Sequence, residues 1–292
     1  MRHRLYGGVR GSLCKGALYS IKLFVQLKNA IGIKGIEETL ASIDQDTLVI
    51  FDVDDVLIVP KDQILQAHNR KYLEKLNQNL EHSVGKENVD IFYSIIFTQR
   101  DNGPVDVKIK DIISQLQSKA IKVLALTNCF TGSFGKIKSM EDWRYNELKK
   151  HGYHFDLSWQ ALKQKNFTEL EKTAKGLSAK SSSMPVFKSG IVFTSAVSKG
   201  QALKAFLQYA GIAPKKIIFV DDKRKHLESV EEIAKSHDIP FIGIEYTAAS
   251  DIPASPLNEK RADLQYKVLE KEKRWISDSE ADALLTNSAK VK

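Results

Sequence analysis

The chain has 292 residues, of which 42% are hydrophobic and 27% charged, a composition typical of a globular protein and unlike that of a disordered one. Its two cysteines, Cys14 and Cys129, form neither a CxxC pair nor a disulfide framework, which argues against cysteine chemistry as the function. The formal net charge is +8, but seven Lys or Arg and no acid precede Glu37, so the rest of the chain is nearly neutral. We expect no nucleic-acid binding, because the rest of the sequence contains neither basic residues interleaved with aromatic ones nor a known nucleic-acid-binding motif.

Residues 1–36 form a basic segment that we expect to be an arm outside the folded core. Its longest apolar stretch, SIKLFVQL, is interrupted by Lys22 and is too short to cross a bilayer. We therefore expect no stable membrane insertion and a cytoplasmic protein. Export or organellar targeting stays open, because an Arg-rich, acid-free start is also typical of transit peptides.

Apolar strands and amphipathic helices alternate after this segment. Helical spacing predicts helices near Ile36 and Leu40, from Ile64 to Leu80, and behind Pro104. Continuous, largely β-branched runs predict four strands: TLVIFDV (47–53), IKVLALT (121–127), KIIFVD (216–221) and IPFIGIEY (239–246). This alternation of strands and helices predicts an α/β fold with a doubly wound parallel sheet. In such folds ligands bind outside the carboxyl ends of the strands.

Two stretches are longer than a simple crossover between strands requires. We predict a core over residues 37–250, with a helical, cap-like insertion at about 60–103 and a second excursion at about 129–189. The second excursion contains a predicted helix over 140–150 and the polar tract KTAKGLSAKSSS. Residues 251–292 are predicted to form a C-terminal helical extension, because Ser277 and Glu280 make a capping box before an apolar stripe.

Polar side chains gather where three predicted strands end: Asp52 and Asp54, Thr127 and Asn128, and Asp221 and Asp222. Asp52 and Asp54 are two residues apart on an extended chain, so their side chains point to the same side. Two close carboxylates repel each other and are tolerated mainly where a cation neutralises them or where they share a proton. The pattern therefore predicts a site at this edge of the sheet.

A lysine stands at the start of another predicted helix. Ser198 and Gln201 form a capping box, which places Lys199 at the first helical position. A positive charge there opposes the helix dipole, so we interpret Lys199 as a residue that reaches forward to an anion.

These four features together resemble the haloacid dehalogenase (HAD) superfamily of phosphohydrolases. In this sequence FDVDDV is similar to the aspartate loop of that family, VLALTN to its strand ending in Ser or Thr, SKGQAL to its lysine motif and IIFVDD to its terminal acidic motif. The resemblance covers residues 45–245, and IIFVDDKRKHLESV is similar to an uncharacterised bacterial HAD-like subfamily (DUF2608-like), whose members often carry an export signal. The first 36 residues depart from that subfamily, because they lack a long apolar segment.

The resemblance implies a Mg²⁺-dependent phosphomonoesterase acting on a small phosphorylated substrate. Asp52 would be the nucleophile that forms an aspartyl-phosphate, and Asp54 would be the general acid and base. Mg²⁺ would be held by Asp52, the main-chain carbonyl of Asp54 and Asp221. Thr127, Asn128 and Lys199 would bind the phosphoryl group.

Several neighbouring residues receive lesser roles in this reading. Asp222 would orient Lys199 or a metal-bound water, and Asp55 is interpreted as a loop or capping residue. Cys129 either borders the site or is simply buried, and His226, which follows the basic run KRK, is expected on an exposed helix face. An alternative function is that of a catalytically silent HAD scaffold acting as a binding or interaction protein.

Overall fold

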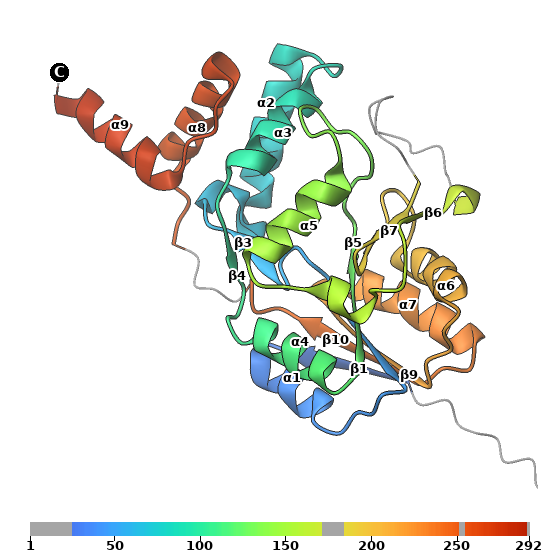
Figure 1. Cartoon of the computed structure of the whole chain (residues 1–292). Helices are drawn as coiled ribbons and strands as arrows, with labels where there is room; N and C mark the ends of the chain where they lie inside the picture. The colour runs from blue at the N-terminus through green and yellow to red at the C-terminus, as the bar shows by residue number, and fades with distance from the viewer. Residues whose placement is uncertain (1–24, 171–183, 251–254, 291–292) are drawn as a thin grey trace, which may run out of the picture.

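A computed structural model describes residues 25–170, 184–250 and 255–290 of the chain. This part of the protein is built around one eight-stranded sheet (Figure 1). In spatial order the strands are β1 (Val25–Ala30), β10 (Phe241–Tyr246), β9 (Lys216–Asp221), β2 (Thr47–Phe51), β5 (Lys122–Thr127), β8 (Ile191–Phe193), β7 (Val186–Lys188) and β6 (Lys165–Asn166). The strands from β1 to β8 in this order are parallel, whereas β7 and β6 form an antiparallel edge.

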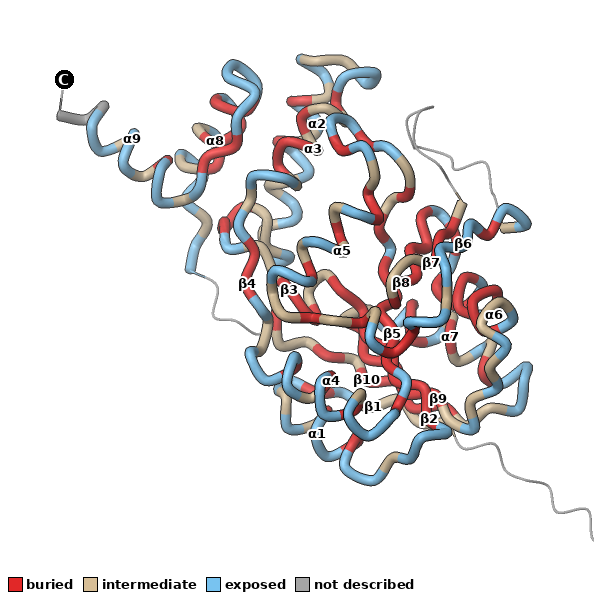
Figure 2. Tube along the Cα trace, viewed as in Figure 1, coloured by how far each residue is buried: buried red, intermediate tan, exposed pale blue. Residues whose placement is uncertain are grey.

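Helices cover both faces of the sheet, because alternate residues of each strand point to opposite sides. In β2, Val49 and Phe51 belong to the core on one face, and Leu48 and Ile50 belong to the core on the other. The first face carries α1 (Ile33–Leu40), α4 (Ile109–Ser118) and α5 (Met140–Lys150), and the second carries α6 (Lys199–Ala210) and α7 (Arg224–Ser236). Figure 2 shows the buried residues concentrated along the sheet between these layers. The predicted α/β fold with a doubly wound parallel sheet is confirmed.

The predicted helical insertion is also present. Strand β3 (Ile58–Pro60) pairs antiparallel with β4 (Asn102–Pro104), and this pair closes the two ends of the insertion. Between them lie the short 3₁₀ turns η1 (Gln63–Leu65) and η2 (Ala67–Asn69) and the helices α2 (Arg70–Val84) and α3 (Val89–Gln99). The insertion has its own apolar core, to which Tyr266 and Leu269 of α8 (Glu259–Glu272) contribute.

The remaining elements are the 3₁₀ turns η3 (Phe155–Ser158) and η4 (Thr168–Leu170) and the C-terminal helix α9 (Asp278–Lys290). Ser277 caps α9 as predicted, since the main-chain N–H of Glu280 donates to Ser277 Oγ at 3.3 Å, but the Glu280 carboxylate pairs with Arg274. Every helix in the described ranges is too short or too polar to cross a bilayer.

Part of the expected N-terminal arm is folded. Residues 25–30 form β1, which pairs with β10 along its whole length, and α1 begins at Ile33. The prediction that residues 25–36 lie outside the core is therefore wrong. It failed because β1 is an edge strand with mostly half-exposed residues, and such a strand has no continuous apolar run. Residues 1–24 and the polar tract at 172–183 lie outside the described residues.

Candidate functional site

Asp52 and Asp221 lie side by side at the carboxyl ends of two neighbouring strands. In the parallel pairing of β2 with β9, Phe51 is opposite Val220, so the next residue of each strand is an aspartate. The main-chain N–H of Asp52 donates to Val220 O at 2.9 Å and fixes this register one residue beyond β2. Within the eight-stranded sheet the chain continues from β2 to β5 and β8 on one side and then returns to β9 on the other side of β2. The aspartates therefore lie where the order of the strands reverses.

Lys199 links the two aspartates. Its Nζ atom lies 2.7 Å from Asp52 Oδ1 and 2.6 Å from Asp221 Oδ2, and its side chain is fully buried. Ser198 caps α6 by accepting a hydrogen bond from the main-chain N–H of Gln201, so Lys199 is the first helical residue, as predicted. Burial acts to lower the pKa of Lys199, but Asp52 and Asp221 more than offset it, so the net pKa is raised and the ammonium stays charged.

The two carboxylates titrate differently because their surroundings differ. Burial raises the pKa of Asp52 to about 8, an effect that Lys199 opposes and the neighbouring charge of Asp221 reinforces. Burial also acts to raise the pKa of Asp221, but Lys199 and His226 outweigh it and hold that pKa below its ordinary value. Two buried carboxylates therefore have a single lysine between them, and a second cation would let both ionise.

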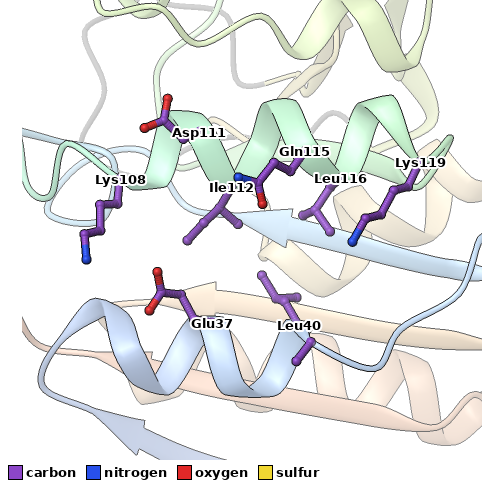
Figure 3. A pocket seen from close by; sticks show the side chains of 9 residues that line it. Glu37, Leu40, Lys108, Asp111, Ile112, Gln115, Leu116 and Lys119 are labelled. Atoms are coloured by element: carbon purple, nitrogen blue, oxygen red, sulfur yellow. The ribbon is translucent and has the colours of Figure 1, made fainter.

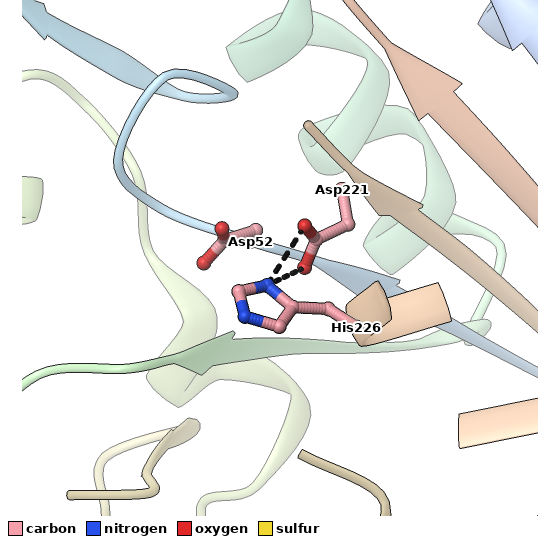
Figure 4. Close-up of side chains that lie close together, drawn as sticks. All are labelled: Asp52, Asp221 and His226. Atoms are coloured by element: carbon pink, nitrogen blue, oxygen red, sulfur yellow. Dashed lines mark hydrogen bonds and ion pairs between the residues drawn. The ribbon is translucent and has the colours of Figure 1, made fainter. Parts of the chain in front are cut away.

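His226 completes this group. Its Nδ1 atom lies 3.1 Å from Asp221 Oδ1 and 3.2 Å from Oδ2, and the residue is buried (Figure 4). The expectation that His226 lies on an exposed helix face is wrong: the first turn of α7 directs it inward, which the basic run before it does not reveal. Asp52, Asp221 and His226 each offer one ligand atom, all within 4.8 Å of one another, so the described residues contain a buried group that could bind a metal ion.

Asp222 lies apart from this contact. It pairs with Lys223, whose Nζ is 3.2 Å from Asp222 Oδ2, whereas the carboxylates bonded to Lys199 are Asp52 and Asp221. Of the two predicted roles of Asp222, a direct bond to Lys199 is not present, and the orientation of a metal-bound water stays a prediction. Burial raises the pKa of Asp222, and its Oδ1 is buried with no hydrogen-bond partner among the described residues.

Asp54 contacts two arginines that the sequence did not single out. Its Oδ2 lies 3.0 Å from Nη2 of Arg144, and its Oδ1 lies 3.9 Å from Nη2 of Arg100. Burial would raise the pKa of Asp54, but the two guanidinium groups outweigh it and hold the pKa below its ordinary value. Asp55 adopts a left-handed backbone conformation (φ 64°) and donates its N–H to Ile58 O, in keeping with a loop role.

The polar residues at the end of β5 differ in their contacts. The Thr127 Oγ1 atom is buried and has no hydrogen-bond partner among the described residues, which is unusual for a fully buried hydroxyl. Asn128 is exposed, and its Oδ1 accepts a hydrogen bond from Thr194 Oγ1. Cys129 is buried and borders a pocket that Asp54 also lines.

Another pocket, of about 340 Å³, lies between α1 and α4 (Figure 3). Glu37 of α1 and Lys108, the residue before α4, extend into the space between the two helices. None of the site residues described above lines it. We therefore place the candidate site at the end of β2 and β9.

Fold and site together define an α/β protein with a buried acidic cluster that could bind a metal ion. The family model "Protein of unknown function (DUF2608)" matches residues 30–282, so the chain belongs to this family.

Relatives of this chain occur in Rickettsia. An uncharacterized protein of Rickettsia prowazekii is 26% identical over 250 residues, which are 86% of this chain and 87% of that protein. One of Rickettsia typhi is 27% identical over 183 residues, 61% of this chain and 59% of that protein. Among solved structures, a Burkholderia xenovorans protein described as haloacid dehalogenase-like covers 73% of this chain and 91% of its own, with a TM-score of 0.33 and 11% identity.

Proposed function

We propose that the protein is a Mg²⁺-dependent phosphohydrolase of the HAD type that cleaves phosphate monoesters through an aspartyl-phosphate on Asp52. The observation that carries this proposal is the pairing of Asp52 with Asp221 across β2 and β9, with Lys199 bonded to both. The order of the sequence motifs, which resembles that of the HAD superfamily, supports it.

The residues present fit a divalent cation. Asp52 and Asp221 together carry more negative charge than Lys199 alone can neutralise, and their oxygens are hard donors that suit Mg²⁺. Asp52, Asp221 and the main-chain carbonyl of Asp54 would hold the ion, with His226 orienting Asp221 through Nδ1. When bound, Mg²⁺ would neutralise charge on the phosphoryl oxygens.

The chain's own groups supply the rest of the reaction. A carboxylate oxygen of Asp52 attacks phosphorus while the bond between phosphorus and the leaving-group oxygen breaks, and water then hydrolyses the aspartyl-phosphate. Lys199 contributes a fixed positive charge to the phosphoryl oxygens. The free hydroxyl of Thr127 offers a neutral donor at the end of the neighbouring strand, beside Asn128.

Asp54 is the proposed proton donor to the leaving group and acceptor from the hydrolytic water. In the structure its carboxylate is engaged with Arg144 and Arg100, which favour the ionised form. The proposed reaction therefore requires this carboxylate to leave the arginines and take up a proton before it protonates the leaving group.

The experiment is hydrolysis of a generic aryl phosphate with and without Mg²⁺, by the natural protein and by Asp52→Asn. We expect activity only with the metal, and a loss of about a thousandfold or more in Asp52→Asn because the nucleophile is removed. Asp46→Asn is a matched control, since Asp46 is an exposed partner of Lys215. Metal-dependent turnover retained by Asp52→Asn would reject the proposal.

A second candidate, a binding protein without turnover, is favoured by the engagement of Asp54 with two arginines. Such a protein would bind beryllofluoride or vanadate together with Mg²⁺ and be stabilised by them against unfolding. It would hydrolyse no phosphate ester at a metal-dependent rate, and this outcome separates it from the enzyme.

A further inference from the structure

A pocket of about 260 Å³ lies next to Asp54, and both excursions from the core build its walls. Leu65, Phe97 and Arg100 come from the helical insertion. The second excursion contributes Cys129, Phe130, Met140, Trp143 and Arg144. Under the proposed function, Asp54 donates a proton to the leaving-group oxygen, and Asp54 also lines this pocket. The part of the substrate that leaves with that oxygen would therefore enter the pocket.

Two arginines with largely buried side chains supply the positive charge of the pocket. The side chains of Arg100 and Arg144 are only 11% and 5% exposed, and the carboxylate that both face is that of Asp54. Arg144 has a second acidic partner, since its Nη1 lies 2.5 Å from Glu147 Oε2. The ion pair of Arg100 with Asp54, at 3.9 Å, is longer than a hydrogen bond, and Arg100 Nε is buried with no hydrogen-bond partner among the described residues.

Aromatic side chains line the pocket beside these charges. Phe97 stacks on Trp143 with ring centroids 5.5 Å apart and planes 24° apart. The Arg100 guanidinium lies 5.3 Å from the centre of the Phe97 ring, and that of Arg144 lies 4.7 Å from the Trp143 ring. Stacked rings with guanidinium groups over them suit a planar, apolar group that ends in an anion.

We propose that this pocket binds the leaving group of the substrate, and that this leaving group is a planar apolar skeleton carrying a second oxyanion, a carboxylate or a phosphate, that pairs with Arg100 and Arg144. The proposal rests on the proposed function. When the Asp54 carboxylate turns to the leaving-group oxygen, Arg144 keeps Glu147 as an acidic partner, but Arg100 loses the carboxylate that it faces. An unpaired buried charge is costly, so an oxyanion of the substrate is the group that takes its place.

The test uses four benzyl phosphates whose leaving groups differ in charge at the para position: unsubstituted, carboxylate, phosphonomethyl and aminomethyl. We expect kcat/KM for the carboxylate or the phosphonomethyl compound to exceed that for the unsubstituted one by about 10- to 100-fold. This is the usual contribution of a hydrogen bond to a charged group. The aminomethyl compound should be the poorest. The two anionic arms show which oxyanion is preferred.

Arg100→Gln should reduce the ratio of anionic to neutral kcat/KM by about tenfold or more, and Arg100→Lys should restore part of it. Arg70→Gln is the matched control, because Arg70 is exposed and pairs along its own helix with Glu74, so it should keep the natural ratio. Urea unfolding checks that each variant is folded. Equal kcat/KM for all four compounds, or an unchanged ratio in folded Arg100→Gln, would overturn the inference.

If the proposed function is wrong, the experiment gives a different result. In that case none of the four esters would be hydrolysed at a metal-dependent rate. Calorimetric binding of benzylphosphonate and 4-carboxybenzylphosphonate, which cannot be hydrolysed, then tests the pocket itself. Tighter binding of the carboxylate, lost in Arg100→Gln, supports the pocket, and equal binding rejects it.

Discussion

Asp52 and Asp221 are far apart in the sequence, yet each is the residue that follows a directly paired position of two parallel strands, Phe51 and Val220. This register forces two carboxylates into one buried space. Lys199 is bonded to both at 2.7 and 2.6 Å. Since one ammonium faces two carboxylates, the stability of this part of the protein and its affinity for a cation depend on the same three side chains.

Replacement of Lys199 by Met should strongly destabilise the metal-free protein. The change keeps the length of the side chain but leaves Asp52 and Asp221 without their buried cation, a change that typically costs about 3–5 kcal/mol. The measurement is urea unfolding in the presence of a chelator. Lys215→Met is the control, because Lys215 is an exposed partner of Asp46.

A loss of less than about 1 kcal/mol in Lys199→Met would contradict a buried ion pair and resemble the effect of an exposed one. Addition of Asp221→Asn to Lys199→Met should recover part of the stability, because the pKa of Asp221 lies below its ordinary value and Asp221 is therefore the carboxylate that carries the buried negative charge.

Replacement of Thr127 by Val should affect stability and phosphate binding in opposite directions. The hydroxyl is buried without a partner, so removing it should stabilise the metal-free protein, by about 1 kcal/mol, since unpaired buried polar groups carry a desolvation penalty. Binding of vanadate in the presence of Mg²⁺ should weaken by about tenfold, because the hydroxyl is the proposed donor to a phosphoryl oxygen. A variant that is both less stable and unchanged in vanadate binding would show that Thr127 has a purely structural role.

Gly200 determines how closely α6, which carries Lys199, approaches α7. A Cβ atom at this position would lie 1.9 Å from the main-chain oxygen of Ser229 in α7, so α6 and α7 pack there with room only for glycine. Gly200→Ala should push α6 away from α7 and destabilise the protein by about 1–3 kcal/mol, the usual cost of overpacking. It should also reduce turnover, because Lys199 moves with the helix.

Gly103→Ala is the comparison for Gly200→Ala. A Cβ at Gly103 would meet only Lys61 Cε, at the ordinary distance of 3.6 Å. Urea unfolding and aryl phosphate hydrolysis measure both effects, and equal stability of the two variants would refute the close packing of α6 on α7.

The sequence was sufficient to predict the positions of those candidate site residues that lie at the ends of predicted strands and helices. Asp52, Thr127 and Asp221 follow continuous apolar strands, and Lys199 follows a capping serine, so their elements and relative positions are visible in the chain order. Parallel strands bring such ends to one edge of the sheet, which is why the predicted positions of these residues agree with those in the structure.

The remaining contacts depend on packing that no local pattern encodes. Arg100 and Arg144 lie in two separate excursions, and only the way these fold over the sheet brings both to Asp54. His226 looks exposed because a basic run precedes it, although the direction of α7 buries it against Asp221. Strand β1 was missed since an edge strand needs no continuous apolar run.

Asp62 should make the docking of the C-terminal helices dependent on pH. Its Oδ2 accepts a hydrogen bond from Trp275 Nε1 at 2.8 Å, and its Oδ1 accepts one from the main-chain N–H of Asp278 at 2.9 Å, so it joins the insertion to the start of α9. Burial raises the pKa of Asp62 above its ordinary value, because it outweighs the two hydrogen bonds that act to lower it.

A folded-state pKa above the unfolded one means that the contribution of Asp62 to stability is fully present below the unfolded pKa of about 3.9. It is lost as the pH rises through the folded pKa. Asp62→Asn cannot titrate, so the stability of the natural protein relative to this variant should fall as the pH rises from about 4 toward 7.

Urea unfolding of both proteins across this pH range, followed by tryptophan fluorescence because Trp275 contacts Asp62, gives the difference directly. Asp263→Asn is the control, since Asp263 accepts its hydrogen bond from Tyr72 at an exposed position. A difference between the natural protein and Asp62→Asn that grows with pH would mean that the hydrogen bonds from Trp275 and Asp278 outweigh the burial of the carboxylate.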